Sequence, residues 1–182
     1  MSKLGLCALI ILFSFKGSVL SQSRNNENLS TVILELNYKS PGLRGMGGYL
    51  SLKNLNSGEE FQSESNKLSF NSFVIVENLP PGTYEVIDFN LEYGGGSIGT
   101  KNSKFFNHLN IKPSSNYFVG SYLAKKVKPI FKFHIQIFKV SSPTEEKILK
   151  KLNKKSDRWS ELNLDFTEQL LRTDTSLVIV RD

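Results

Sequence analysis

The sequence is poor in the residues that most often carry chemistry or crosslinks. It has one cysteine, Cys7, and two histidines, His108 and His134, which lie far apart. One cysteine cannot close an internal disulfide, and two distant histidines do not have the spacing of zinc ligands. No serine has a recognisable histidine and aspartate to activate it, so nucleophilic catalysis has no support. We therefore expect no catalytic residue, no metal site and no cofactor.

Apolar runs long enough to cross a membrane are also missing. Residues 4–15 are apolar and follow Lys3, but about 12 residues fall short of the roughly 17–25 that a spanning helix needs. This pattern, followed by a small-residue cleavage motif, predicts a signal peptide over residues 1–21. An uncleaved N-terminal anchor is the alternative. We expect the mature chain to start at Gln22, to have a flexible leader over residues 22–29 and to have no transmembrane span.

Apolar and aromatic residues, by contrast, are abundant. Hydrophobic residues make up 39% of the 182, and they include 13 Phe and 6 Tyr. This content is enough for one sizeable core and excludes a wholly disordered chain. We expect one main domain with additions.

Strand patterns fill residues 30–142. Over residues 31–38, apolar side chains alternate with others in the period of two that is typical of a half-buried strand. Similar runs, separated by Gly, Pro, Asn and Ser, predict strands at residues 49–55, 59–63, 67–77, 83–93, 105–111, 116–124 and 130–140. Short strands with a turn about every ten residues predict a mainly β fold, an antiparallel β-sandwich.

The run FVIVENLPPGTYEVIDF, residues 73–89, is the strongest of these signals. Two β-prone stretches flank a Pro-Pro-Gly turn, in which Pro81 fixes φ and Gly82 accepts a positive φ. The segment from Asn78 to Tyr84 resembles the Leu-Pro-x-Gly-x-Tyr turn of the transthyretin-like or carboxypeptidase-regulatory-like sandwich domains. Tyr117-Phe118-Val119-Gly120 is similar to a later aromatic strand of envelope proteins of this kind.

This resemblance covers residues 30–140. It implies a prealbumin-like sandwich in a secreted or envelope protein. It implies no activity for the domain, because in carboxypeptidases catalysis belongs to a separate zinc domain, whose residues this sequence lacks.

The chain changes character at Ser142. The run Ser142-Pro143-Thr144-Glu145 predicts a helix N-terminus with a capping box, and the helix should continue to about Lys154. We also expect a second helical segment over residues 166–172, with Phe166, Leu170 and Leu171 facing inward, and a terminal strand over residues 177–180. Together residues 143–182 are expected to form a helical extension that packs on the sandwich and covers a sheet edge.

Two surface features are candidate binding sites. Gly94, Gly95 and Gly96 open the run GGGSIGTK, which nearly matches a phosphate-binding loop. Its lysine is displaced and no helix follows, so a flexible hairpin loop is favoured, and such loops often carry recognition.

The second feature is a basic cluster of Lys125, Lys126 and Lys128 beside aromatic residues. The excess of basic over acidic side chains in residues 22–142 makes an anionic lipid or glycan surface a candidate target. Lysines that protect a sheet edge from aggregation are the favoured interpretation. Nucleic acid is not expected for an exported protein.

We therefore expect an exported, non-enzymatic sandwich that binds or scaffolds in the cell envelope, with an envelope protein as partner. Its destination is periplasmic, envelope-associated or secreted. A small-ligand or glycan binder that uses the glycine-rich loops at residues 42–48 and 94–99 is one alternative. A hydrolase with an unrecognised site is another.

Overall fold

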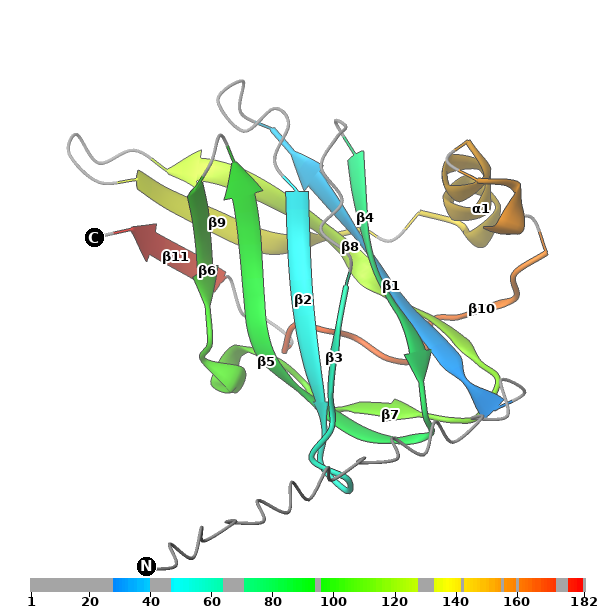
Figure 1. Cartoon of the computed structure of the whole chain (residues 1–182). Coiled ribbons are helices and arrows are strands. Elements are labelled where there is room, and N and C mark those ends of the chain that lie inside the picture. Colours follow the sequence, from blue (N-terminus) through cyan, green and yellow to red (C-terminus); the bar gives the residue numbers. More distant parts are fainter. Residues whose placement is uncertain are drawn as a thin grey trace, which may run out of the picture.

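The computed structural model describes residues 28–39, 47–63, 71–93, 96–127, 133–141, 143–154, 156–159, 161–172 and 177–181. The predicted signal peptide and most of the predicted leader lie outside these residues. Within them, the protein is mainly β, with two sheets and a C-terminal helix (Figure 1).

Sheet A has the strand order β11-β9-β8-β1-β4, with β10 also paired to β8. Its strands are β1 (Ser30–Tyr38), β4 (Asn71–Leu79), β8 (Asn116–Val127), β9 (Phe133–Val140), β10 (Leu164–Asp165) and β11 (Leu177–Arg181). The β1–β8 and β10–β8 pairs are parallel, and the others are antiparallel. The prediction of an antiparallel arrangement is therefore wrong for β1 and β8. These two strands lie far apart in the sequence and pair in parallel.

Sheet B has the order β3-β2-β5-β6, with β7 also paired to β5, and its described pairs are all antiparallel. Its strands are β2 (Gly47–Asn54), β3 (Glu60–Gln62), β5 (Gly82–Tyr93), β6 (Gly96–Thr100) and β7 (Leu109–Ile111). The helical elements are η3 (Ser103–Phe105), α1 (Glu145–Asn153) and η4 (Asp157–Trp159).

The Pro-Pro-Gly turn joins the two sheets. Its flanking strands are β4 and β5, as the sequence predicts, but β4 belongs to sheet A and β5 to sheet B. The Tyr84 hydroxyl donates to the Pro80 carbonyl oxygen (2.6 Å), which fixes the start of β5 against the turn. Gly82 has a φ of 157°, and a Cβ there would lie 2.7 Å from Asn54 Nδ2. Glycine is thus required where the chain crosses between sheets.

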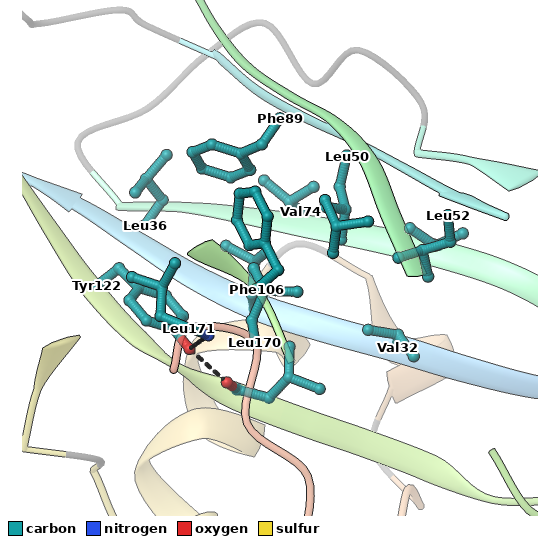
Figure 2. Packing of buried hydrophobic residues seen from close by; sticks show 14 of the residues in the cluster. Val32, Leu36, Leu50, Leu52, Val74, Phe89, Phe106, Tyr122, Leu170 and Leu171 are labelled. Carbon is teal, nitrogen blue, oxygen red and sulfur yellow. Dashed lines mark hydrogen bonds between the residues drawn. The ribbon is translucent and has the colours of Figure 1, made fainter. Parts of the chain in front are cut away.

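Side chains from both sheets form one buried cluster, which we call the inner core (Figure 2). Alternate residues of β1 and β4 enter it from sheet A, and alternate residues of β2 and β5 enter it from sheet B. Figure 2 labels ten of its members: Val32, Leu36, Leu50, Leu52, Val74, Phe89, Phe106, Tyr122, Leu170 and Leu171. This is the arrangement that period-two alternation predicts.

The opposite face of sheet A is buried too, under a second cluster that we call the outer layer. It joins sheet residues to α1, η4 and β10, and its buried members are Ile33, Phe73, Phe118, Ile148, Leu152, Trp159 and Leu164. All residues from Val32 to Leu36 are buried as a result. The prediction that β1 is half-buried is wrong, because α1 covers the face that alternation assigns to solvent (Figure 1).

The C-terminal region differs from its prediction in two ways. Helix α1 begins at Glu145 with Thr144 as its N-cap, later than predicted, and Ser142 lies outside the described residues. The predicted capping box of Glu145 with Ser142 therefore lies partly outside the described residues. Glu145 Oε1 accepts a hydrogen bond from the backbone N–H of Leu164 (2.9 Å), which ties the helix start to β10.

The second difference concerns residues 166–172, which are not helical. This segment, which we call the strap, runs between the sheets. Leu170 N–H donates to the Val119 carbonyl (3.1 Å) and Arg172 N–H donates to the Phe105 carbonyl (3.2 Å). These hydrogen bonds to β8 and to η3 take the place of the hydrogen bonds of a helix. The side chains of Leu170 and Leu171 are buried in the inner core. The strand predicted at residues 177–180 is present as β11.

Candidate binding groove

The glycine-rich candidate is largely a strand. Gly94 and Gly95 lie outside the described residues, whereas Gly96 begins β6, which pairs with β5. A Cβ at Gly99 would lie 2.5 Å from the Phe89 backbone carbonyl oxygen and would also clash with the Asn90 side chain, so close pairing with β5 requires glycine there. The prediction of a flexible loop is wrong for residues 96–100. The next element is the short 3₁₀ helix η3, so no α-helix directly follows β6 to hold a phosphate.

The lysine candidate does not form one patch in the described residues. Lys125 and Lys126 are both exposed near the end of β8, and Lys128 lies outside the described part. Because consecutive residues of a strand point to opposite faces, the two described lysines diverge. Tyr122, an aromatic neighbour in the sequence, is buried in the inner core.

A buried charge lies between sheet A and α1. Glu35, on β1, is 1% exposed. The Ser121 hydroxyl donates to its Oε2 (2.7 Å), and Lys151 Nζ, from α1, forms an ion pair with its Oε1. Both carboxylate oxygens therefore have partners, and the pair fastens α1 to the sheet. The signal for this contact in the sequence is a single acidic residue within the apolar run of residues 32–36.

Tyr122 fastens the strap in a comparable way. Its hydroxyl donates to the Val119 carbonyl (2.7 Å) and accepts from the backbone N–H of Leu171 (3.3 Å), as Figure 2 shows. Burial raises the pKa of Tyr122 to about 12. Hydrogen bonding to the backbone of Leu171 and Leu170 opposes this rise by lowering the pKa. The hydroxyl therefore stays protonated over the neutral range and acts as a structural hydrogen-bonding group.

A groove of about 460 Å³ opens where β8 begins, and we call it the β8–β10 groove. One wall is the turn between β7 and β8, and the other is the chain around β10. The lining residues are Ser114, Ser115, Asn116, Asn163, Leu164, Asp165 and Phe166. Parallel pairing of Leu164 with Asn116 and of Asp165 with Tyr117 joins the two walls.

Another hollow, of about 470 Å³, lies on α1 and is lined by Glu146, Leu149, Lys150, Asn153 and Lys154. All of these residues come from one helix and the residue after it, so this hollow is the flank of that helix. The β8–β10 groove is instead built by segments far apart in the sequence. We take it as the candidate site for this reason.

The turn that forms the first wall is held by the start of β1. Ser30 is buried, and its hydroxyl donates to the Lys112 carbonyl (2.7 Å) and accepts from Ser115 N–H (3.1 Å). Thr31 N–H donates to the Ser115 carbonyl (3.0 Å). Ser114 has a φ of 54°, a conformation that few non-glycine residues adopt. The wall is thus fixed to sheet A, and its turn falls between the strands that the sequence predicts at residues 105–111 and 116–124.

The second wall brings a carboxylate and an aromatic ring together. Asp165 Oδ1 accepts from Thr167 N–H (2.8 Å). The Thr167 side chain, then its backbone N–H, and more weakly the charge of Lys112 lower the pKa of Asp165, so it is ionised at neutral pH. Phe166 is 36% exposed, and its ring packs on that of Phe118 with the centroids 5.3 Å apart. The predicted inward position of Phe166 is therefore wrong.

This groove offers hydrogen-bonding groups and one apolar surface. Among the described residues, no group of three or more His, Cys, Asp or Glu is placed to hold a metal ion. No pattern in the sequence indicates the groove, because its walls come together through the parallel β10–β8 pair and the contact of Phe166 with Phe118. A sequence pattern cannot predict such a pair between distant segments.

No family model, curated protein or solved structure significantly matches the chain. In the part of the chain that the structure describes, none of the helices has the length and apolar character needed to cross a membrane.

Proposed function

We propose that the chain is an exported, non-enzymatic β-sandwich of the transthyretin-like (prealbumin-like) kind that serves as a binding or scaffolding module in the cell envelope. The β8–β10 groove is the observation that carries this proposal. Two sheets with a common core, joined at the Pro-Pro-Gly turn, support the sandwich assignment. The apolar segment at residues 4–15 after Lys3 supports export.

The buried polar groups support a non-enzymatic role. A general acid or base needs a proton-exchanging atom near the substrate and a pKa near the working pH. Both oxygens of Glu35 are bound by Ser121 and Lys151, and burial holds Tyr122 in its neutral form. These groups stabilise the packing of α1 and of the strap.

A binding module needs a surface that is rigid and still open to a ligand. The walls of the β8–β10 groove are held by Ser30 on one side and by pairing with β8 on the other, while Asn163 and Phe166 are exposed. Such preorganisation lowers the entropy cost of binding. An envelope protein stays the proposed partner, and an anionic surface reached through Lys125 and Lys126 stays a prediction.

Photo-crosslinking in the native host tests this proposal. A photoreactive residue replaces Asn163 in the groove, and a matched control replaces Asn56, an exposed asparagine in the turn between β2 and β3. We expect a specific adduct from position 163 and none from position 56. Equal background at both positions would contradict a binding role for this surface.

Intact mass measured in each cell fraction tests the export component separately. We expect a chain that starts at Gln22 in the exported fraction. A full-length chain that stays in the cytoplasm would contradict export. The crosslinking experiment would then still test binding at the groove.

A further inference from the structure

We propose that the β8–β10 groove binds a carbohydrate, with a sugar ring resting on Phe166 and its hydroxyl groups hydrogen-bonded to Asp165, Asn116 and Asn163. This inference rests on the proposed function as a binding module, and it names the ligand class. The groove is distinct from the glycine-rich loops that the sequence suggested for glycan binding.

The aromatic ring is the first argument. Among the described large apolar side chains, Phe166, at 36%, and Leu55, at 45%, are the exposed ones. Contact with Phe118 holds the Phe166 ring on the outer layer while leaving part of it accessible. The C–H face of a pyranose is apolar and flat enough to pack against such a ring, whereas its edges are polar. A ring that borders polar side chains matches this two-sided character.

The carboxylate is the second argument. Asp165 is fixed by Thr167 and carries a negative charge at neutral pH, so it is a strong acceptor for ligand O–H groups. A pair of neighbouring sugar hydroxyls suits the two oxygens of one carboxylate. The same charge disfavours phosphate and carboxylate ligands at this position.

The amides and hydroxyls are the third argument. Asn116 and Asn163 lie on opposite walls, and each amide both donates and accepts hydrogen bonds. Ser115 adds a hydroxyl to the lining. Sugar hydroxyls also donate and accept, so a neutral, polyhydroxylated ligand can satisfy this lining with few unpaired groups. A mainly apolar peptide would bury these polar groups without partners.

The size of the groove limits the ligand. A volume of about 460 Å³ is at the lower end of small-molecule sites. One or two sugar units therefore fit, and the shallow, solvated setting predicts a Kd on the order of 0.1–1 mM for a short oligosaccharide. Repeated units on a polymer would raise the apparent affinity through avidity.

A glycan array followed by NMR titration tests the inference. The folded protein is applied to immobilised neutral hexose, N-acetylhexosamine and acidic oligosaccharides, and the best soluble oligosaccharide is titrated into labelled protein. We expect retention on neutral glycans, and amide shift changes confined to residues 113–117 and 163–167.

Three variants locate the binding site. We expect F166A and D165N each to weaken binding at least tenfold while the protein stays folded. L55A removes the other exposed large apolar side chain and should bind as the parent protein does. Equal loss in L55A, or shift changes elsewhere on the protein, would overturn the assignment to this groove.

The outcomes separate this inference from the proposed function. No retention on any glycan, together with a specific protein adduct from position 163, would overturn the carbohydrate assignment and leave the binding module intact. No glycan and no adduct would overturn both.

Discussion

The two faces of sheet A are both buried, but they are built differently. The inner face meets sheet B in a large apolar cluster, to which the strap contributes Leu170 and Leu171. The outer face meets α1, η4 and β10 in a smaller apolar cluster, and the ion pair between buried Glu35 and partly exposed Lys151 also joins sheet A to α1. The inner face combines a large apolar area with the hydrogen bonds of the Tyr122 hydroxyl, whereas the outer layer has less apolar area and an ion pair.

This difference separates stability from binding. The β8–β10 groove takes one wall from the outer layer, through Leu164 and Phe166, and the other from a turn fixed to β1. No described residue of the inner core lines the groove that we propose as the binding site. We infer that substitutions in the outer layer alter the proposed binding groove, while large-to-small substitutions of apolar side chains in the inner core cost the most stability.

The largest expected effect is in the inner core. Phe106 is 2% exposed, and its ring lies 6.1 Å from that of Phe89. Phe106→Ala removes this packing and leaves a cavity, which costs about 3–5 kcal/mol. Urea unfolding should show a lower midpoint with an unchanged slope. A loss below about 1 kcal/mol would mean that the inner face is not the main source of stability.

The next effect is in the outer layer. Lys151→Ala leaves the Glu35 carboxylate buried without its cation. Losing a partner from a fully buried pair costs about 3–5 kcal/mol, but the Lys151 side chain is 38% exposed. Solvent screening therefore reduces the expected loss to about 1–3 kcal/mol in urea unfolding.

A matched control for this loss lies on the same helix. Lys150 is exposed, so Lys150→Ala should change stability by less than about 0.5 kcal/mol. A combined Glu35→Leu and Lys151→Met variant should recover most of the loss, because no charge stays buried. Equal effects of the two single lysine variants would contradict the fastening role of the ion pair.

Tyr122→Phe tests how the strap is held in the inner core. The change leaves the Val119 carbonyl and the Leu171 N–H without their hydroxyl partner, and we expect a loss of about 1–2 kcal/mol. Tyr49→Phe, at a half-buried position on β2, is the matched control and should be nearly neutral.

The same variant changes the response to high pH. Burial raises the pKa of Tyr122 from 10.0 to about 12. The stability linked to this group is therefore complete below pH 10, and about 2–3 kcal/mol of it is lost as the pH rises to 12. Tyr122→Phe should flatten this part of the pH–stability curve. An unchanged slope would contradict the burial of a protonated hydroxyl.

The smallest effect concerns Asp165, in the groove wall. Hydrogen bonds from Thr167 lower its pKa below the ordinary 3.8. The linked stability is therefore present above about pH 4 and is lost as the pH falls through the lowered pKa. Because the group is close to solvent, we expect only a few tenths of a kcal/mol, absent in Asp165→Asn. A loss comparable to that of Lys151→Ala would place Asp165 in the packing of the outer layer.

The sequence predicts local structure well where one force dominates. Alternation gives the positions of most strands, and the Pro-Pro-Gly run gives the turn after β4. The apolar positions Ile148, Leu149 and Leu152 predict a helix with one inward face, and in α1 the first and last are buried and Leu149 is partly buried. These features depend on neighbours in the chain.

Features that depend on distant segments could not be predicted. The parallel β1–β8 pair and the placement of β4 and β5 in different sheets follow from the global fold. Residues 166–172 have apolar spacing suited to a helix, yet backbone bonds to Val119 and Phe105 hold them extended between the sheets. The groove escaped prediction for the same reason, because its walls meet only in the folded chain.

Native-state hydrogen exchange tests the central comparison most directly. The Leu170 and Leu171 amides donate to Val119 and Tyr122 within the inner core, whereas the Ile148 amide donates to Thr144 in α1 on the outer layer. We predict that the two strap amides exchange in the slowest class, together with those of β8, and that Ile148 exchanges faster through a partial opening. If the strap amides instead open together with α1, the strap belongs to the outer layer and the account of two separate faces is wrong.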